Sequence, residues 1–101
     1  MTLYRQKVLD ELAKCKSNME ARYGVRRIGL FGSVARDQAG QASDIDIVVE
    51  MDSPDVFAIV HLKEELEANL AVFGANVDIV QYRERMNRFL KERIDHEAMY
   101  V

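Results

Sequence analysis

The sequence predicts an α/β fold, α+β by strict classification, with a small mixed β-sheet and helices mainly on one face. Helical segments alternate with short strand-like runs in the order α-β-β-α-β-α, and alternating elements must bury their apolar sides against one another. The strand-like runs are rich in β-branched residues, and they occupy residues 25–31, 45–51 and 76–81. A chain of 101 residues is large enough for one core, so we expect residues 1–101 to form a single domain.

The first helix is predicted over residues 2–23, where apolar side chains recur at helical spacing at Val8, Leu12, Cys15 and Met19. Thr2 is the expected N-cap, and Gly24 is the expected residue after the last turn. After the first strand, Gly32 and Ser33 interrupt the apolar run. A short helical turn over residues 34–37 and a polar loop over residues 38–43 are expected to follow.

Ser53 and Pro54 predict the start of a second long helix, with Ser53 as the N-cap and Pro54 in the first helical position. This helix is expected to continue to residue 70 or 72, with its inward side at Val56, Ile59, Leu62, Leu66 and Leu70. A last helix is predicted over residues 83–97, and a short strand over 98–101. The apolar side of this helix is expected at Met86, Phe89, Leu90 and Ile94.

The composition is that of a soluble globular protein, with 49% hydrophobic and 31% charged residues. A net charge of −3 argues against general coating of DNA or RNA, so no direct nucleic-acid binding is expected. One cysteine excludes an intrachain disulfide. Neither a signal-peptide pattern nor a membrane-length apolar run is present, so we expect a cytoplasmic protein. A homo-oligomer is compatible with the sequence, which leaves the oligomeric state open.

Two aspartates stand at the start of the most apolar strand. Asp44 and Asp46 are two residues apart, so in a strand their side chains project from one face, roughly 7 Å apart along the backbone. Ile45 and Ile47 then project from the opposite face, into the core. Two carboxylates on one face repel each other, and a divalent cation removes that penalty.

Asp78 lies inside the third apolar run, in the sequence Val-Asp-Ile-Val. If this strand neighbours the second, Asp78 joins Asp44 and Asp46 on one face. Three converging carboxylates are typical of a two-metal site for phosphoryl or nucleotidyl transfer. Gly32 allows a ligand close to the backbone, and Ser33 offers a hydroxyl and an N–H to a phosphate. The pattern of a Walker A loop is absent from the sequence.

The pattern Gly32-Ser33, ten residues, Asp44-Ile45-Asp46 and a downstream Asp78 resembles the signature of the DNA polymerase β-like nucleotidyltransferase superfamily. Within that superfamily, the short chain resembles the minimal nucleotidyltransferase (MNT) group, and most of the chain is covered. The resemblance implies the polymerase β-like nucleotidyltransferase fold. It also implies a partner, because members of the group are antitoxins of HEPN-domain toxins and transfer AMP from ATP to a tyrosine of the toxin.

The resemblance also implies roles for individual residues. Gly32 and Ser33 would bind the triphosphate of ATP, Asp44 and Asp46 would hold two Mg²⁺, and Asp78 would share one metal and act as the general base. Arg36 and Ser43 are further nucleotide-binding candidates. A surface ion pair is the alternative for Arg36, and a turn or cap role is the alternative for Ser43.

Three functional interpretations remain open at the level of sequence. The first is an active protein adenylyltransferase, which the complete carboxylate set favours. The second is an inactive module that neutralises its partner by binding alone. The third is nucleotide transfer to a small molecule, which usually needs a second domain to hold the acceptor. The preferred nucleotide, the modified hydroxyl and the need for the partner in activity are left open.

Overall fold

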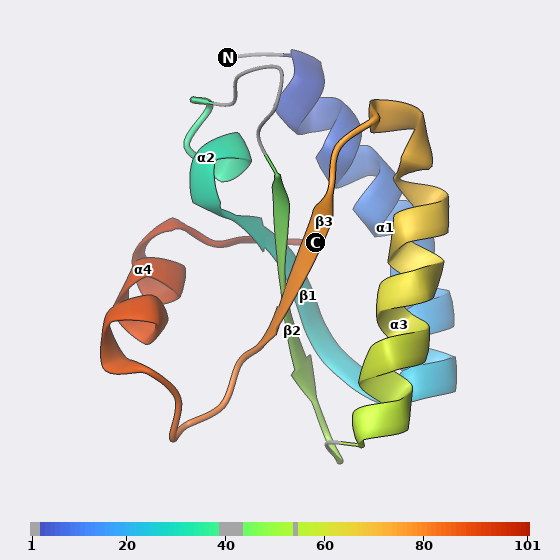
Figure 1. Cartoon of the computed structure of the whole chain (residues 1–101), viewed down its shortest axis with the longest axis vertical. Coiled ribbons are helices and arrows are strands. Elements are labelled where there is room, and N and C mark those ends of the chain that lie inside the picture. The colour runs from blue at the N-terminus through green and yellow to red at the C-terminus, as the bar shows by residue number, and fades with distance from the viewer. Residues whose placement is uncertain (1–2, 39–43, 54) are drawn as a thin grey trace.

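The computed structural model describes residues 3–38, 44–53 and 55–101 (Figure 1). The elements in chain order are α1 (Leu3–Tyr23), β1 (Val25–Phe31), α2 (Gly32–Ala35), β2 (Ile45–Met51), α3 (Val56–Asn69), the 3₁₀ turn η1 (Ala71–Phe73), β3 (Val77–Gln81), α4 (Arg88–Glu97) and β4 (Met99–Tyr100). The predicted fold class is confirmed, including the short final strand. Within these residues, no helix is both long and apolar enough to cross a lipid bilayer.

The four strands form one mixed sheet in the order β3-β2-β1-β4. β1 runs antiparallel to both β2 and β4, whereas β2 and β3 run parallel. Parallel neighbours require a crossover connection, and α3 supplies it between β2 and β3. β2 therefore lies inside the sheet, which explains its nearly continuous run of β-branched residues.

The two faces of the sheet are covered unequally (Figure 1). α1 and α3 lie on one face and bury the larger core, to which β2 contributes Ile45, Ile47 and Val49. α4 lies on the other face over a smaller cluster formed by Phe31, Val48 and Ile94. Alternation along β2 thus supplies both cores, and it places the side chain of Asp46 on the α4 face with Val48.

The predicted end of the first helix is confirmed at Gly24, which has a φ of +66°. Its N–H donates to the carbonyl of Glu20 at 3.1 Å, as is usual where an α-helix ends at a residue in the left-handed conformation. The predicted start of the second helix at Ser53 is wrong. Asp55 is the N-cap instead, and its Oδ1 accepts from the N–H of Phe57 at 2.9 Å. Pro54 and Thr2 lie outside the described residues.

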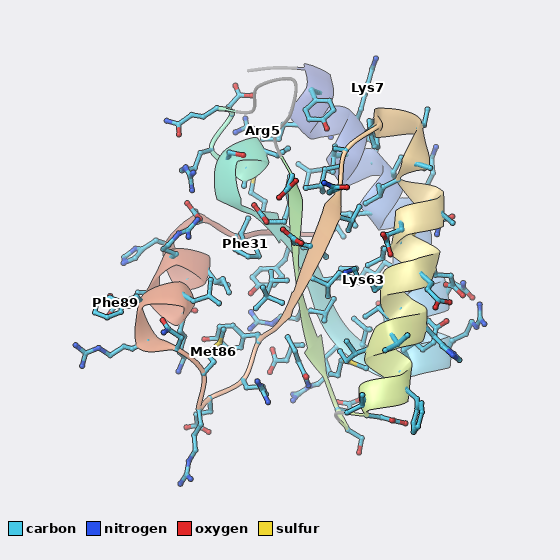
Figure 2. The ribbon with its side chains drawn as sticks, viewed as in Figure 1. Arg5, Lys7, Phe31, Lys63, Met86 and Phe89 are labelled. Carbon is cyan, nitrogen blue, oxygen red and sulfur yellow. The ribbon has the colours of Figure 1, made fainter. Side chains whose placement is uncertain are left out.

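The prediction that Val56 and Phe89 face inward is also wrong. Val56 occupies the first turn of α3 and is 77% exposed, while Leu62 and Leu66 are buried further along. α4 begins at Arg88 rather than at residue 83, because the side chain of Asn87 caps it by accepting from the N–H of Leu90 at 3.0 Å. With this start, Phe89 is 70% exposed and points away from the sheet (Figure 2).

Candidate active site

Two of the predicted aspartates are direct neighbours in the sheet. In the parallel pair of β2 and β3, Asp46 is in register with Asp78, so both side chains project from the same face. Asp44 lies one residue before the start of β2 and two residues before Asp46. Asp46 is partly buried, whereas Asp44 and Asp78 are exposed. The strand pairing therefore places a partly buried carboxylate beside a solvent-facing one.

The ionisation of Asp46 reflects this arrangement. Burial raises the pKa of the Asp46 carboxyl above its usual range, and the charges of Asp78 and Asp44 raise it further. The guanidinium groups of Arg93 and Arg36 act in the opposite direction. The negative charge on Asp46 is thus unfavourable in the protein alone, and a bound cation would relieve it.

Gly32 lies directly against the carboxylate of Asp46. Its φ is +78°, a conformation that side chains with a Cβ rarely adopt. A Cβ added at Gly32 would overlap Oδ2 of Asp46 and would stand 3.0 Å from its Cγ. Gly32 is therefore required both by the backbone turn and by the close approach of Asp46.

The turn that begins at Gly32 is held from two sides. On the α1 side, Nη1 of Arg5 donates to the carbonyl of Ala35 at 3.0 Å, and Figure 2 shows Arg5 beside α2. On the α4 side, Oε1 of Glu97 accepts from the N–H of Gly32 at 3.2 Å. Ser33, the next residue, is partly buried in this turn.

Glu97 also accepts from two arginines. Nη1 of Arg36 donates to its Oε2 at 2.8 Å, and Nη2 of Arg93 lies 3.5 Å from its Oε1. Burial alone would raise the pKa of Glu97, but the hydrogen bonds from Arg36 and from the Gly32 backbone outweigh it and lower the pKa. Glu97 is therefore a charged residue that joins α4 to the turn.

The structure places the predicted residues Gly32, Ser33, Asp44, Asp46 and Asp78 at one end of the sheet. Arg36 is ion-paired with Glu97, which is the alternative expected for it from the sequence; a role in nucleotide binding stays a prediction. Ser43 lies outside the described residues.

Sequence reasoning missed Glu97. Its only sequence signal is the short strand that follows it. That strand, β4, pairs with β1 at Leu30 and Met99 and so brings Glu97 to Gly32. The pairing of β4 with β1 could not be assigned from the sequence.

The carboxylates fit a magnesium site by their chemistry. Among the described residues, no group of three His, Cys, Asp or Glu side chains is arranged to hold a metal ion as it stands. Mg²⁺ does not need such a group, since it takes one or two carboxylates together with waters and substrate phosphates. Asp46 and Asp78, in register on adjacent strands, meet that requirement, and Asp44 lies two residues before Asp46 in the chain.

A mixed sheet that carries carboxylates on adjacent strands beside a glycine–serine turn defines a class of proteins that transfer nucleotides. The chain belongs to the nucleotidyltransferase domain family, whose pattern matches residues 12–100. It is a nucleotidyltransferase of the minimal type, with the polymerase β-like fold.

Two curated relatives span nearly the same length. The protein adenylyltransferase MntA of Thermococcus cleftensis is 36% identical over 87 residues, which cover 85% of this chain and 84% of the relative. MJ0128 of Methanocaldococcus jannaschii, assigned as a protein adenylyltransferase, is 35% identical over 95 residues. That match covers 93% of this chain and 94% of the relative.

Solved structures share the fold. One assigned as a minimal nucleotidyltransferase is 32% identical with a TM-score of 0.69, and the match covers 97% of this chain and 92% of that chain. A second is a complex of the tri-AMPylated HEPN toxin of Shewanella oneidensis with an MNT antitoxin. It is 22% identical with a TM-score of 0.64, and the match covers 95% of this chain and 70% of that chain.

Proposed function

We propose that this protein transfers AMP from ATP to a tyrosine hydroxyl of a partner HEPN-domain toxin and so acts as an antitoxin. The observation that carries the proposal is the register of Asp46 with Asp78, beside a glycine turn that leaves no room for a side chain at residue 32. An inactive binding module would gain nothing from a partly buried carboxylate whose charge is disfavoured by its neighbours.

The residues divide the chemistry of the transfer. Asp44, Asp46 and Asp78 would hold two Mg²⁺, which supply positive charge to the triphosphate and its transition state when bound. The Gly32-Ser33 turn and Arg36 would bind the phosphates. Asp78, which is exposed, would accept the proton of the attacking hydroxyl. The hydroxyl oxygen would form a bond to the α-phosphorus, and the bond to the bridging oxygen would break to release pyrophosphate.

Two relatives support the choice of a protein acceptor. One is named a protein adenylyltransferase, and the complex described above contains a toxin carrying AMP groups together with an MNT protein. A partner protein would then deliver the hydroxyl.

α4 is the candidate surface for that partner. It lies on the same face of the sheet as Asp46 and carries Phe89, which is 70% exposed and directed outward (Figure 2). Arg88, whose guanidinium carbon lies 5.8 Å from the ring centre of Phe89, adds a cation beside this aromatic ring. Aromatic residues and arginine are enriched at protein interfaces.

The proposal is tested by intact-mass spectrometry of the partner toxin after co-expression with this protein. We expect the toxin to gain the mass of one or more AMP groups, and Asp44→Ala or Asp46→Ala to abolish the gain. Asp52→Ala is the matched control, because Asp52 is an exposed aspartate beyond the other end of β2, paired with Arg26 at 3.1 Å. Full neutralisation of the toxin by the Asp44→Ala, Asp46→Ala double variant, with no mass gain for the wild type, would instead favour inhibition by binding alone.

A further inference from the structure

Glu97 gathers hydrogen-bond donors from three separate places in the fold. They are the backbone of Gly32 at the end of β1, Arg36 at the end of α2, and Arg93 one turn earlier on α4. The Glu97 side chain is only 16% exposed. A carboxylate so placed fixes the two guanidinium groups relative to the turn.

The two arginines held in this way lie near Asp46, because the N–H of Gly32 donates to the same Glu97 carboxylate and Gly32 lies directly against Asp46. Among the described residues, no hydrogen bond joins either arginine to Asp46. Arg36 is 38% exposed and Arg93 is 54% exposed, so each keeps part of its guanidinium open to solvent. A guanidinium has five N–H donors, and only some are used by Glu97.

Donors that remain open beside a carboxylate cluster suit an anion that brings its own cation. A triphosphate with Mg²⁺ is such an anion: the metal would meet Asp46 while phosphate oxygens meet the arginines. We propose that Glu97 is a positioning residue, which holds Arg36 and Arg93 at the edge of the carboxylate site so that Arg93 joins Arg36 in binding the phosphates. The inference rests on the proposed nucleotide transfer and adds Arg93 and Glu97 to its machinery.

Glu65 offers a matched comparison on the other face of the sheet. It also binds several donors, namely Arg22, Tyr23 and Asn18, and its side chain is 23% exposed. Glu65 lies on α3, on the face opposite to that of Asp46. Loss of its charge should therefore affect folding in a similar way without affecting nucleotide binding.

The test is calorimetric titration of the full chain with ATP and Mg²⁺. Glu97→Gln should weaken binding about tenfold or more, the loss expected when charge-assisted hydrogen bonds are misplaced, and Glu65→Gln should leave it unchanged. In transfer assays the change should fall on KM for ATP rather than on kcat. In the Arg36→Ala background, Glu97→Gln should weaken ATP binding by a smaller factor than it does in the wild type. The reason is that part of the effect of Glu97 on binding passes through Arg36.

Unchanged or tighter ATP binding in Glu97→Gln, with wild-type binding intact, would overturn the inference and leave the proposed function standing. Tighter binding would mean that Glu97 competes with the phosphates for their donors. If Glu97→Gln does not fold, Arg93→Gln replaces it in the test, because this variant removes the guanidinium of Arg93 alone. Weaker ATP binding by Arg93→Gln supports the inference, and unchanged ATP binding overturns it. A wild type that binds no ATP overturns both the inference and the proposed function.

Discussion

The two faces of the sheet show how one strand serves both stability and chemistry. On the α1 and α3 face, β2 contributes Ile45, Ile47 and Val49, all of which are 0% exposed, to a continuous apolar core. On the α4 face, the same strand contributes Val48 to a small cluster and Asp46 to the open end.

The difference between the faces is a difference in cover. Two long helices close the first face, whereas one ten-residue helix covers part of the second (Figure 1). The first face can therefore stabilise the fold while the second leaves carboxylates exposed to solvent. Carboxylates could not be placed on the closed face without a large desolvation penalty.

The largest expected effect on stability comes from the closed face. Ile47→Ala should lower the free energy of unfolding by about 2–5 kcal/mol, because it removes buried methyl groups from a tightly packed core. Ile94→Ala, an identical change in the α4 cluster, should lower the free energy of unfolding by less than Ile47→Ala does, within the same range. A half-covered cluster can collapse around the gap that the substitution leaves. Urea unfolding measures both. An equal or larger loss for Ile94→Ala would contradict the division between the faces.

The glycines sharpen the comparison at the site. Gly32 and Gly24 both have positive φ, so alanine at either should cost roughly 1–3 kcal/mol of unfolding free energy. Only at Gly32 would the new Cβ strike Asp46, since nothing lies within 4 Å of a Cβ at Gly24. Calorimetry should therefore show weakened ATP and Mg²⁺ binding for Gly32→Ala and unchanged binding for Gly24→Ala. Equal binding by the two variants would mean that the contact with Asp46 is not part of the site.

The smallest expected effect is a gain in stability at the open face. Asp46→Asn, without divalent metal, should raise the free energy of unfolding by roughly 0.2–1 kcal/mol at neutral pH, because it relieves repulsion across a strand pair. Since burial and the neighbouring aspartates raise the pKa of Asp46 in the folded state, the wild type carries this penalty above the folded pKa. The penalty fades as the pH falls from the folded pKa towards the ordinary pKa of aspartate, and it is absent below that ordinary value. Urea unfolding at a series of pH values should show the gain shrinking with acidity. A gain that grows as the pH falls would contradict this account.

Much of this arrangement could be predicted from the sequence. Asp44 and Asp46 alternate with Ile45 and Ile47, and this alternation assigned the two carboxylates to one face. Asp78, an aspartate inside an apolar run, suggested that its strand lies beside the strand of Asp46. These are local patterns with a period of two, and β-strands express that period directly.

The remainder depended on long-range contacts or competing caps. Helix starts were misplaced because Asp55 and Asn87, rather than the residues chosen from the sequence, supply the side-chain caps. Glu97 could not be identified because it reaches Gly32, 65 residues away, only through the pairing of β4 with β1.

The central claim is that Asp46 serves ligand binding at the expense of stability, and thermal unfolding of wild type and Asp46→Asn, each with and without ATP and Mg²⁺, tests it most directly. Without ligand, Asp46→Asn should unfold at the higher temperature. With saturating ATP and Mg²⁺, the order should reverse, because the wild type gains more stability from binding than the variant does. An Asp46→Asn variant that unfolds at the lower temperature in the absence of ligand, or a wild type whose midpoint does not respond to ATP and Mg²⁺, would contradict the account.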